Sequence, residues 1–342
     1  MLEPPNLPAD IILAAISAHY DLPVSEATFL PLGNDAGAWV YRLQAGQAQY
    51  FLKVRHNLRS EASLAVPRYL CDQGVPHIVA PLPTLTGALW TRLADYLLIL
   101  YPFIDGRTGR AARLTDAQWM EFGATIGRLH GAALPAELAA KVKRENFEPA
   151  WSASIRSLDE RLSAGPLEDD VERALADFWR IRRAEIRAIN ARAEELGRQL
   201  QAAPPPLVVC HADAHTDNVL IDANQQLWLV DWDETVHAPK ERDLMFVVGA
   251  SDVNNRTHPR TTQLFLAGYG PGEVDWLALA YYRYEWAVQE IGDDGERILS
   301  TAWGADTRQA ALREFLRLFE PGRDVAQAYL SEARLWRGSP PE

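Results

Sequence analysis

Residues 211–233 read HADAHTDNVLIDANQQLWLVDWD and contain most of the reactive side chains that this chain offers. Two apolar runs flank a polar turn in this stretch, which is the pattern of a β-hairpin. We expect a four-residue loop in which Asp222 pairs with Leu227. The same register would place Asn218 opposite Asp231, on one side of the sheet, with their Cα atoms roughly 4.5–5.5 Å apart. An amide oxygen and a carboxylate so placed can share one cation.

Three polar side chains of this stretch suit phosphoryl transfer. Mg²⁺ prefers oxygen ligands and keeps waters and substrate phosphates in its other positions, so Asn218 and Asp231 are sufficient protein ligands. Asp213 stands five residues before Asn218, on the loop after an expected strand at 207–210. A carboxylate there can orient an acceptor hydroxyl and take its proton, so we predict Asp213 as the catalytic base. The alternative is turn chemistry, because Asp and Asn favour loops.

The order H-x-D-x-x-x-x-N, followed by an aspartate at the end of the next hairpin, resembles a pattern shared by protein kinases and aminoglycoside phosphotransferases. The second family is the closer match, because D-W-D at 231–233 replaces the D-F-G of protein kinases and no A-P-E motif follows. Further segments are similar to its spectinomycin phosphotransferase branch, namely YFLK at 50–53, KERDLMF at 240–246 and YYRYE at 281–285. The resemblance covers most of the chain.

This resemblance implies an α+β, protein-kinase-like fold of two lobes that binds ATP and Mg²⁺. A small, β-rich nucleotide lobe would comprise residues 1–105, and a larger, mainly helical catalytic and substrate lobe would comprise residues 106–342. The implied reaction is transfer of the γ-phosphate of ATP to a hydroxyl of a small molecule such as an aminoglycoside or an aminocyclitol like spectinomycin.

The resemblance also assigns individual residues to the nucleotide. Lys53 would contact the ATP phosphates, and Glu61 would be its ion-pair partner. Phe103 and Ile104 would contact the adenine ring, and the loop at 33–37 would cover the phosphates.

Two residues near the catalytic loop are assigned to support. His211 would hold the loop by hydrogen bonds, and Asp233 would support the metal ligands, with helix capping as the alternative role of Asp233. His211 and His215 do not indicate zinc, because a third nitrogen or sulfur ligand is missing at any usual spacing.

The remaining pattern is a β-rich part followed by a mainly helical part. A first helix at 10–20 precedes a meander of three β-like runs, and YLLILY at 96–101 predicts a buried strand. We place the lobe boundary directly after that strand. The three runs are 28–32, 39–43 and 50–55, and the later helices are expected at 116–130, 170–201, 275–291, 307–319 and 324–336.

Charge limits the class of ligand. The formal net charge of −12 repels phosphate backbones, which disfavours nucleic acid as a partner and favours a cationic acceptor. Four acidic residues on one expected helix are candidates for binding amines, although a solvated helix face is the ordinary explanation of such a cluster. They are Glu285, Glu290, Asp293 and Asp294.

Cysteine content and the N-terminus indicate the compartment. The two cysteines lie far apart, which predicts neither a disulfide framework nor a thiolate metal site. No basic leader or membrane-spanning run is evident, so we expect a cytoplasmic protein without a membrane partner.

Two other functions stay open at this point. The chain could be a metabolic kinase of the same fold that acts on a sugar, choline or homoserine. It could also be a nucleotide-binding pseudokinase with a regulatory role. The presence of Lys53, Asp213, Asn218 and Asp231 together argues against the second alternative, because a binding module does not need a base.

Overall fold

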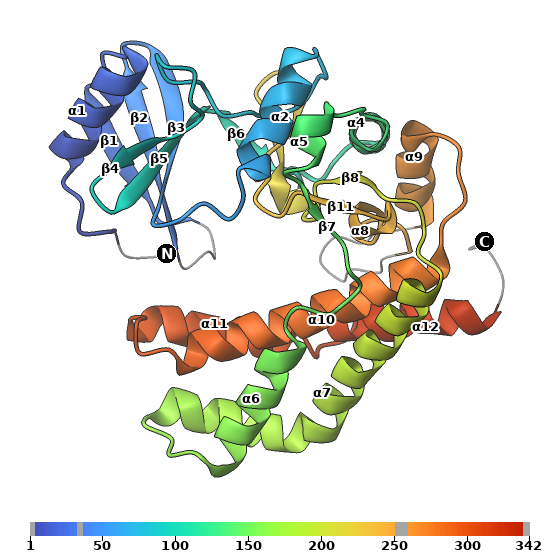
Figure 1. The fold of residues 1–342 in the computed structure, drawn as a ribbon. Coiled ribbons are helices and arrows are strands. Elements are labelled where there is room, and N and C mark those ends of the chain that lie inside the picture. The colour runs from blue at the N-terminus through green and yellow to red at the C-terminus, as the bar shows by residue number, and fades with distance from the viewer. Residues whose placement is uncertain (1–3, 33–36, 250–258, 338–342) are drawn as a thin grey trace. The chain divides into compact units, whose positions relative to one another are not determined.

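The computed structural model describes residues 4–32, 37–249 and 259–337, and the chain forms two compact units (Figure 1). The first unit contains Met1–Lys143 and His211–Val236, and the second contains Arg144–Cys210 and His237–Glu342. Both units combine strands with helices, which confirms the predicted α+β class. The predicted boundary at residue 105 does not coincide with this division, because the first unit extends to Lys143 and also includes the hairpin stretch.

A five-stranded antiparallel sheet begins the first unit. Its strands are β1 (Glu26–Leu30), β2 (Ala38–Ala45), β3 (Ala48–Arg55), β4 (Thr91–Leu93) and β5 (Tyr96–Pro102), in the order β1-β2-β3-β5-β4. Helix α1 (Ala9–Tyr20) contributes Ile12 and Ile16 to a core that also contains Leu52 and Val54 of β3. The predicted first helix and meander are confirmed, whereas β4 was not predicted. Residues 33–36 of the predicted phosphate loop lie outside the described residues.

The alternation of side chains along β3 determines where its two cations point. Leu52 and Val54 are fully buried in the core under α1. Because successive side chains of a strand point to opposite faces, Lys53 and Arg55 lie on the other face. Both are nevertheless buried, with 8% and 4% of their surface exposed. A buried cation requires a counter-charge, so this face of the sheet must carry acceptors.

A three-stranded sheet contains the predicted hairpin. Its strands are β6 (Gly106–Thr108), β9 (Val219–Asp222) and β10 (Leu227–Leu229), in the order β10-β9-β6. Leu227 pairs with Ile221 rather than with Asp222. The predicted register was therefore wrong by one residue, and Asn218 does not stand directly opposite Asp231.

The hairpin loop explains this difference. Asp222 N–H donates to Gln226 O at 3.0 Å, so three residues rather than four connect the strands. Gln225 adopts a φ of 63°, the left-handed conformation that such loops need at this position. The side chain of Gln118, on helix α4 (Asp116–His130), donates to Gln225 O at 3.1 Å. A tertiary contact thus supports a conformation for which glycine is the usual residue.

Gly106 is required by the close approach of β6 to β9. A Cβ atom added at this position would lie 2.5 Å from Ile221 O. No side chain fits within that distance, and the backbone oxygen cannot move without breaking the strand pairing.

Three further helices, together with the one-turn 3₁₀ helix η1 (Thr216–Asn218) before β9, complete the description of the first unit. They are α2 (Ala62–Asp72), which contains Pro67, and the short α3 (Gly109–Ala112) and α5 (Ala136–Ala139). Helix α4 begins with a capping box formed by Thr115 and Gln118, which satisfies N–H groups at its start. The expected helix at 116–130 is confirmed.

Helix α10 (Trp276–Leu299) is the centre of the mainly helical second unit (Figure 1). It packs against four longer helices and against the short helix at Glu241–Leu244, and it buries Tyr281, Tyr282 and Tyr284. The four are α6 (Ser152–Ala164), α7 (Asp170–Ala202), α11 (Ala305–Arg317) and α12 (Asp324–Arg337). The other elements are β7 (Lys143–Arg144), β8 (Val208–Cys210), β11 (Val236–Ala238), α8 (Glu241–Leu244) and α9 (Pro259–Tyr269). Among the helices in the described ranges, none has the length and apolarity needed to cross a bilayer.

Candidate active site

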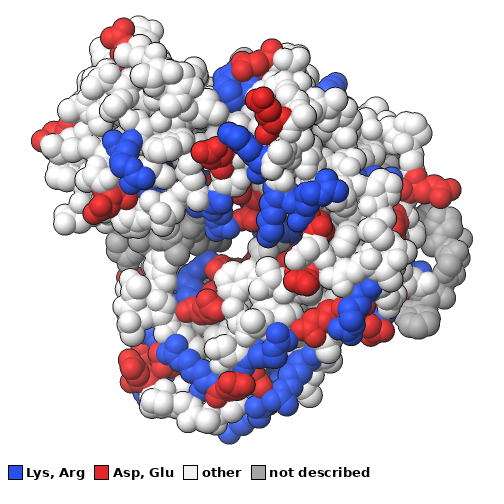
Figure 2. Space-filling model, viewed as in Figure 1, with Lys and Arg blue, Asp and Glu red and all other residues white. Residues whose placement is uncertain are grey.

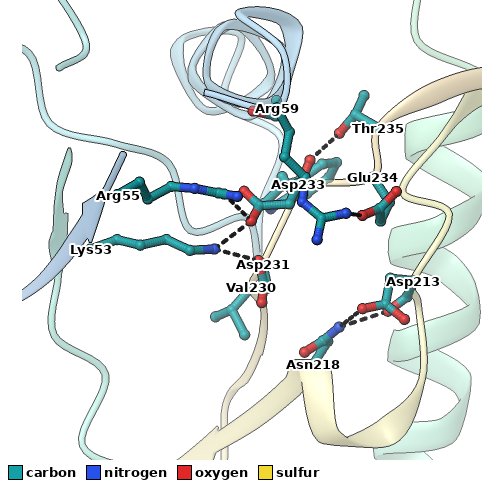
Figure 3. A network of polar contacts seen from close by, with 12 residues as sticks. Lys53, Arg55, Arg59, Asp213, Asn218, Val230, Asp231, Asp233, Glu234 and Thr235 are labelled. Atoms are coloured by element: carbon teal, nitrogen blue, oxygen red, sulfur yellow. Dashed lines mark hydrogen bonds and ion pairs between the residues drawn. The ribbon is translucent and has the colours of Figure 1, made fainter. Parts of the chain in front are cut away.

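Four side chains of the first unit form a charge-balanced network beside the hairpin (Figure 3). Lys53 Nζ lies 2.9 Å from Asp231 Oδ1 and 2.6 Å from Asp233 Oδ2. Arg55 donates from a terminal guanidinium nitrogen to the same oxygen of Asp233. Two buried cations of β3 thus find their counter-charges in the two carboxylates that follow β10.

The backbone changes direction where the hairpin ends. Val230 N–H donates to Asn218 O at 3.0 Å, and Asp231 then adopts a φ of 62°. This left-handed conformation is uncommon for residues other than glycine, but aspartate tolerates it better than most. Costly backbone conformations concentrate at functional sites. At Asp231 this turn ends the alternation of side chains along the hairpin, and the carboxylate contacts Lys53.

Electrostatics favour the charged forms of Lys53 and Asp233. Burial opposes the charge of Lys53, but the carboxylates of Asp231 and Asp233 outweigh it and raise the pKa of Lys53 above its usual value. Burial likewise opposes the charge of Asp233, but Lys53 and Arg55 lower the pKa of Asp233 below its usual value. Lys53, Arg55 and Asp233 therefore resemble a desolvated ion-pair cluster, in which removal of one member leaves another charge uncompensated, whereas Asp231 keeps 45% of its side chain exposed.

His211 connects the loop before the hairpin to the end of β10. Asp213 N–H donates to His211 Nδ1 at 3.3 Å, so Nδ1 is the acceptor of the ring. His211 Nε2, 2.9 Å from Val230 O, then carries the proton and donates it to that oxygen. The imidazole is fully buried and stacks at an angle on Trp232, with ring centroids 4.7 Å apart. These contacts fix the backbone on both sides of the proposed catalytic residues.

Asp213 is held by one of its carboxylate oxygens. Asn218 Nδ2 donates to Asp213 Oδ2 at 2.7 Å and to Asp213 O at 2.9 Å. The other oxygen, Oδ1, accepts no hydrogen bond from the described residues and lies 3.3 Å from His215 Nε2. Burial raises the pKa of Asp213 above its usual value; the two histidines oppose this shift, and Asp231 adds to it. An oriented carboxylate with one open oxygen and a raised pKa has the properties of a general base.

The backbone next to Asp213 is strained. Ala212 has a φ of 68°, a conformation that is uncommon for alanine, whose methyl side chain cannot hydrogen-bond to the backbone as that of asparagine or aspartate can. Its neighbour His211 is the residue that anchors this loop. The strain fits a loop that is shaped for chemistry rather than for stability.

Asn218 and Asp231 each have one oxygen available for a metal. Asn218 uses Nδ2 toward Asp213, and its Oδ1 accepts no hydrogen bond from the described residues. Asp231 uses Oδ1 toward Lys53, and its Oδ2 is likewise without a partner there. One amide and one carboxylate oxygen form a donor set that suits a hard divalent cation such as Mg²⁺. The residues present therefore fit the ion that the sequence predicts, even though the register that suggested it was wrong.

Glu61 is not the partner of Lys53 in this structure, contrary to the predicted ion pair. It precedes α2 and lies 3.0 Å from Lys141 Nζ, with both side chains more than half exposed. Asp231 and Asp233 take its place beside Lys53. The two residues expected at the adenine ring follow β5: Phe103 N–H donates to Gln49 O at 3.4 Å, and Phe103 and Ile104 are half-buried. Their contact with adenine stays a prediction.

The acidic residues of α10 are compensated within the second unit. Glu285 lies 3.0 Å from Arg242, and Asp293 and Asp294 both pair with Arg297. Burial raises the pKa of Asp294 to about 7, with Arg297 acting against the shift. Glu290 is half-buried on the same helix. Most of these carboxylates are therefore internal ion-pair partners, which weakens the argument that their charge attracts amines.

Arg55 is the member of the site that the sequence interpretation missed. Its signal was available, because residues two apart on a strand share a face and Lys53 was already assigned to the nucleotide. A second missed pair, between Arg59 and Glu234, joins the same two segments nearer the surface.

Comparisons with known proteins give one consistent result. The sequence model of the phosphotransferase enzyme family matches residues 28–282. The crystal structure of a spectinomycin phosphotransferase in complex with ADP and spectinomycin is similar at a TM-score of 0.86 with 30% identity, covering 96% of this chain and 99% of that one. Its AMP-bound complex gives a TM-score of 0.81 with 29% identity, covering 94% and 98%.

Curated relatives are more distant. Protein StrN of Streptomyces griseus is 26% identical over 282 residues, which are 78% of this chain and 81% of that protein. A homoserine kinase of Neisseria meningitidis is 25% identical over 234 residues, which are 67% and 68% of the two chains. A choline kinase from Streptococcus pneumoniae shares the fold, at a TM-score of 0.55 and 14% identity, with 90% and 98% of the chains covered.

Proposed function

The chain belongs to the phosphotransferase enzyme family and is a kinase of small molecules, and we propose that it transfers the γ-phosphoryl group of ATP to a hydroxyl of an aminocyclitol such as spectinomycin. The reaction type is inferred from the state of one atom, the carboxylate oxygen Oδ1 of Asp213. This buried carboxylate oxygen accepts no hydrogen bond from the described residues, while Oδ2 is fixed by Asn218.

The chain's own residues supply the following mechanism. Asp213 Oδ1 accepts a hydrogen bond from the acceptor hydroxyl, orients its oxygen toward the γ-phosphorus and takes its proton as the new P–O bond forms. The bond between the γ-phosphorus and the bridging oxygen breaks, and ADP leaves. Lys53 donates to the phosphates of the nucleotide and offsets their charge. Mg²⁺, when bound by Asn218 Oδ1 and Asp231 Oδ2, would neutralise charge that develops on the phosphates.

The acceptor is proposed from the relatives rather than from a charged patch. The spectinomycin phosphotransferase matches this chain over nearly its whole length, at 30% identity. The net charge of −12 favours a cationic acceptor in general. On the face that Figure 2 shows, however, acidic and basic side chains are interspersed and do not form one acidic surface. A direct role of the acidic residues of α10 stays a prediction, which the acceptor KM of Glu290→Gln tests.

A homoserine-type metabolic kinase is the second candidate, because a homoserine kinase matches 67% of this chain at 25% identity. Measurement of ADP release with ATP, Mg²⁺ and a panel of acceptors separates the two. The panel contains spectinomycin, aminoglycosides, homoserine, choline and neutral sugars, and Asp213→Asn protein serves as the control for contaminating kinases. Stimulation by spectinomycin supports the proposal. Stimulation by homoserine, choline or a neutral sugar without spectinomycin turnover refutes it and assigns a metabolic role instead.

A further inference from the structure

Two segments of the first unit are joined by four ion pairs. Lys53 and Arg55, on β3, and Arg59, shortly after that strand, face a run of three acidic residues after β10 (Figure 3). These are Asp231, Asp233 and Glu234. Lys53, Arg55 and Asp233 keep only 10%, 5% and 14% of their side-chain surface exposed, whereas Arg59 and Glu234 keep 47% and 34%, and Asp231 keeps 45%. The contacts of Asp233 with Lys53 and Arg55 are therefore more desolvated than the pair of Arg59 with Glu234, and they lie at the nucleotide lysine.

Asp233 has a different position in this network from Asp231. Asp231 is also a proposed metal ligand, so its charge is shared when the site is filled. Asp233 accepts from Lys53 at 2.6 Å and from Arg55 through one and the same oxygen. Only 14% of its side chain is exposed, and both of its cationic partners contact the same oxygen. It can therefore remain the counter-ion of Lys53 after Asp231 has engaged a metal.

Arg55 determines where that counter-ion stands. Its side chain is 5% exposed, it is fixed by β3, and its hydrogen bond to Asp233 Oδ2 is independent of Lys53. Without Arg55, Asp233 would have only the flexible lysine as a cationic partner among the contacts above. A guanidinium is also the better anchor, because its planar donors fix the direction of a carboxylate while an ammonium acts as a point charge.

From these contacts we propose that Arg55 is a positioning residue for nucleotide binding. It acts through Asp233, and this pair takes the part that the sequence had assigned to Glu61, namely to hold the Lys53 ammonium where the phosphates bind. Glu61 has no share in it, because it pairs with Lys141 at the surface. The inference rests on the proposed function only in that Lys53 contacts the phosphates of a nucleotide.

The test compares the nucleotide affinity of the wild type and six variants by titration calorimetry with ADP and with a non-hydrolysable ATP analogue, each with and without Mg²⁺. Arg55→Gln removes the anchor, and Asp233→Asn removes the counter-ion. Arg59→Gln is the matched control, since it removes an arginine that ties down the same segment without touching Asp233. Glu61→Gln tests the residue to which the sequence had assigned the role that Arg55 and Asp233 have here.

The expected result is that Arg55→Gln and Asp233→Asn each raise the nucleotide Kd about tenfold, which corresponds to about 1.4 kcal/mol. Arg59→Gln and Glu61→Gln should change it less than about twofold. Arg55→Lys should restore affinity only in part, because it returns the charge without the planar fork. The double variant Arg55→Gln/Asp233→Asn should lose less than the sum of the two single losses, because both act through one contact. Circular dichroism identifies any variant that does not fold, and Asp233→Asn then carries the test in place of Arg55→Gln.

Two outcomes overturn the inference. One is unchanged nucleotide affinity in folded Arg55→Gln or Asp233→Asn protein. The other is an equal loss in Arg59→Gln, which would show that the arginines only tie the two segments together. A wild-type chain that binds no nucleotide would instead refute the proposed function, so the two failures are distinguishable.

Discussion

Replacement of Asp213 by asparagine separates catalysis from binding at this site. Asparagine has the shape of aspartate, and its Oδ1 can turn to accept the 2.7 Å hydrogen bond that Asn218 Nδ2 now donates to the carboxylate. The 2.9 Å bond from Asn218 to the backbone of residue 213 is unaffected. The position facing the acceptor then carries an amide that cannot take a proton. The change thus removes the base and leaves its supports in place.

The expected loss follows from that single difference. General-base assistance contributes roughly 10²–10⁴-fold, so kcat should fall by about 3–5 kcal/mol in activation free energy. A loose transition state would place the loss near the lower end, because the base then mainly orients the hydroxyl. Nucleotide affinity should hardly change, since Asp213 contacts neither Lys53 nor Asp231.

The assay is kcat at saturating acceptor, measured beside the nucleotide Kd. Asp217→Asn is a suitable control, because Asp217 stands in the same loop and pairs at 2.7 Å with Arg110 instead of with the catalytic residues. It should keep near wild-type turnover. The reasoning fails if Asp213→Asn retains more than about a tenth of wild-type kcat, or if its nucleotide affinity falls in parallel with turnover.

Three further outcomes are expected. Asp231→Ala should abolish turnover and the Mg²⁺ dependence of nucleotide binding while the thermal melt stays cooperative; retained Mg²⁺ dependence would exclude Asp231 as a ligand. Burial raises the pKa of Asp294 to about 7, so the folded state holds a proton that the unfolded chain releases, and stability should fall as pH rises from about 4 to 7. This fall in the free energy of unfolding amounts to at most about 4 kcal/mol and can be measured by denaturation at several pH values. Asp294→Asn should flatten it, and an unchanged slope would contradict the assignment. Gly106→Ala forces a methyl group against Ile221 O and should lower the free energy of unfolding by about 1–3 kcal/mol, so an unchanged melting temperature would refute the close approach.

Much of the fold could be predicted because local pattern and tertiary structure agree. The meander, the buried strand at 96–101 and the long helices follow from periodicity alone. The hairpin was recognised for the same reason. Its register was not, because a three-residue loop normally shows glycine at the left-handed position, and Gln225 conceals that signal. The contact from Gln118 that supports this conformation is 107 residues away in sequence.

In the site, too, contacts between residues that are far apart in sequence could not be predicted from local pattern. Asp213, Asn218 and Asp231 lie close together in sequence, so their spacing carried the prediction. The partners of Lys53, Asp231 and Asp233, are 178 and 180 residues away in the sequence. The resemblance to the family suggested Glu61 instead. The structure corrects this because Glu61 meets Lys141 at the surface, whereas the buried face of β3 demands counter-charges and the segment after β10 provides them.

The most direct test of the phosphoryl-transfer centre is a crystal structure of the chain with Mg²⁺ and a non-hydrolysable ATP analogue. The account predicts a metal ion at about 2.0–2.1 Å from an oxygen of Asn218 and from one of Asp231, with the γ-phosphate facing Asp213. A metal ion more than about 4 Å from both side-chain oxygens would contradict it, since magnesium ligation does not extend to that distance.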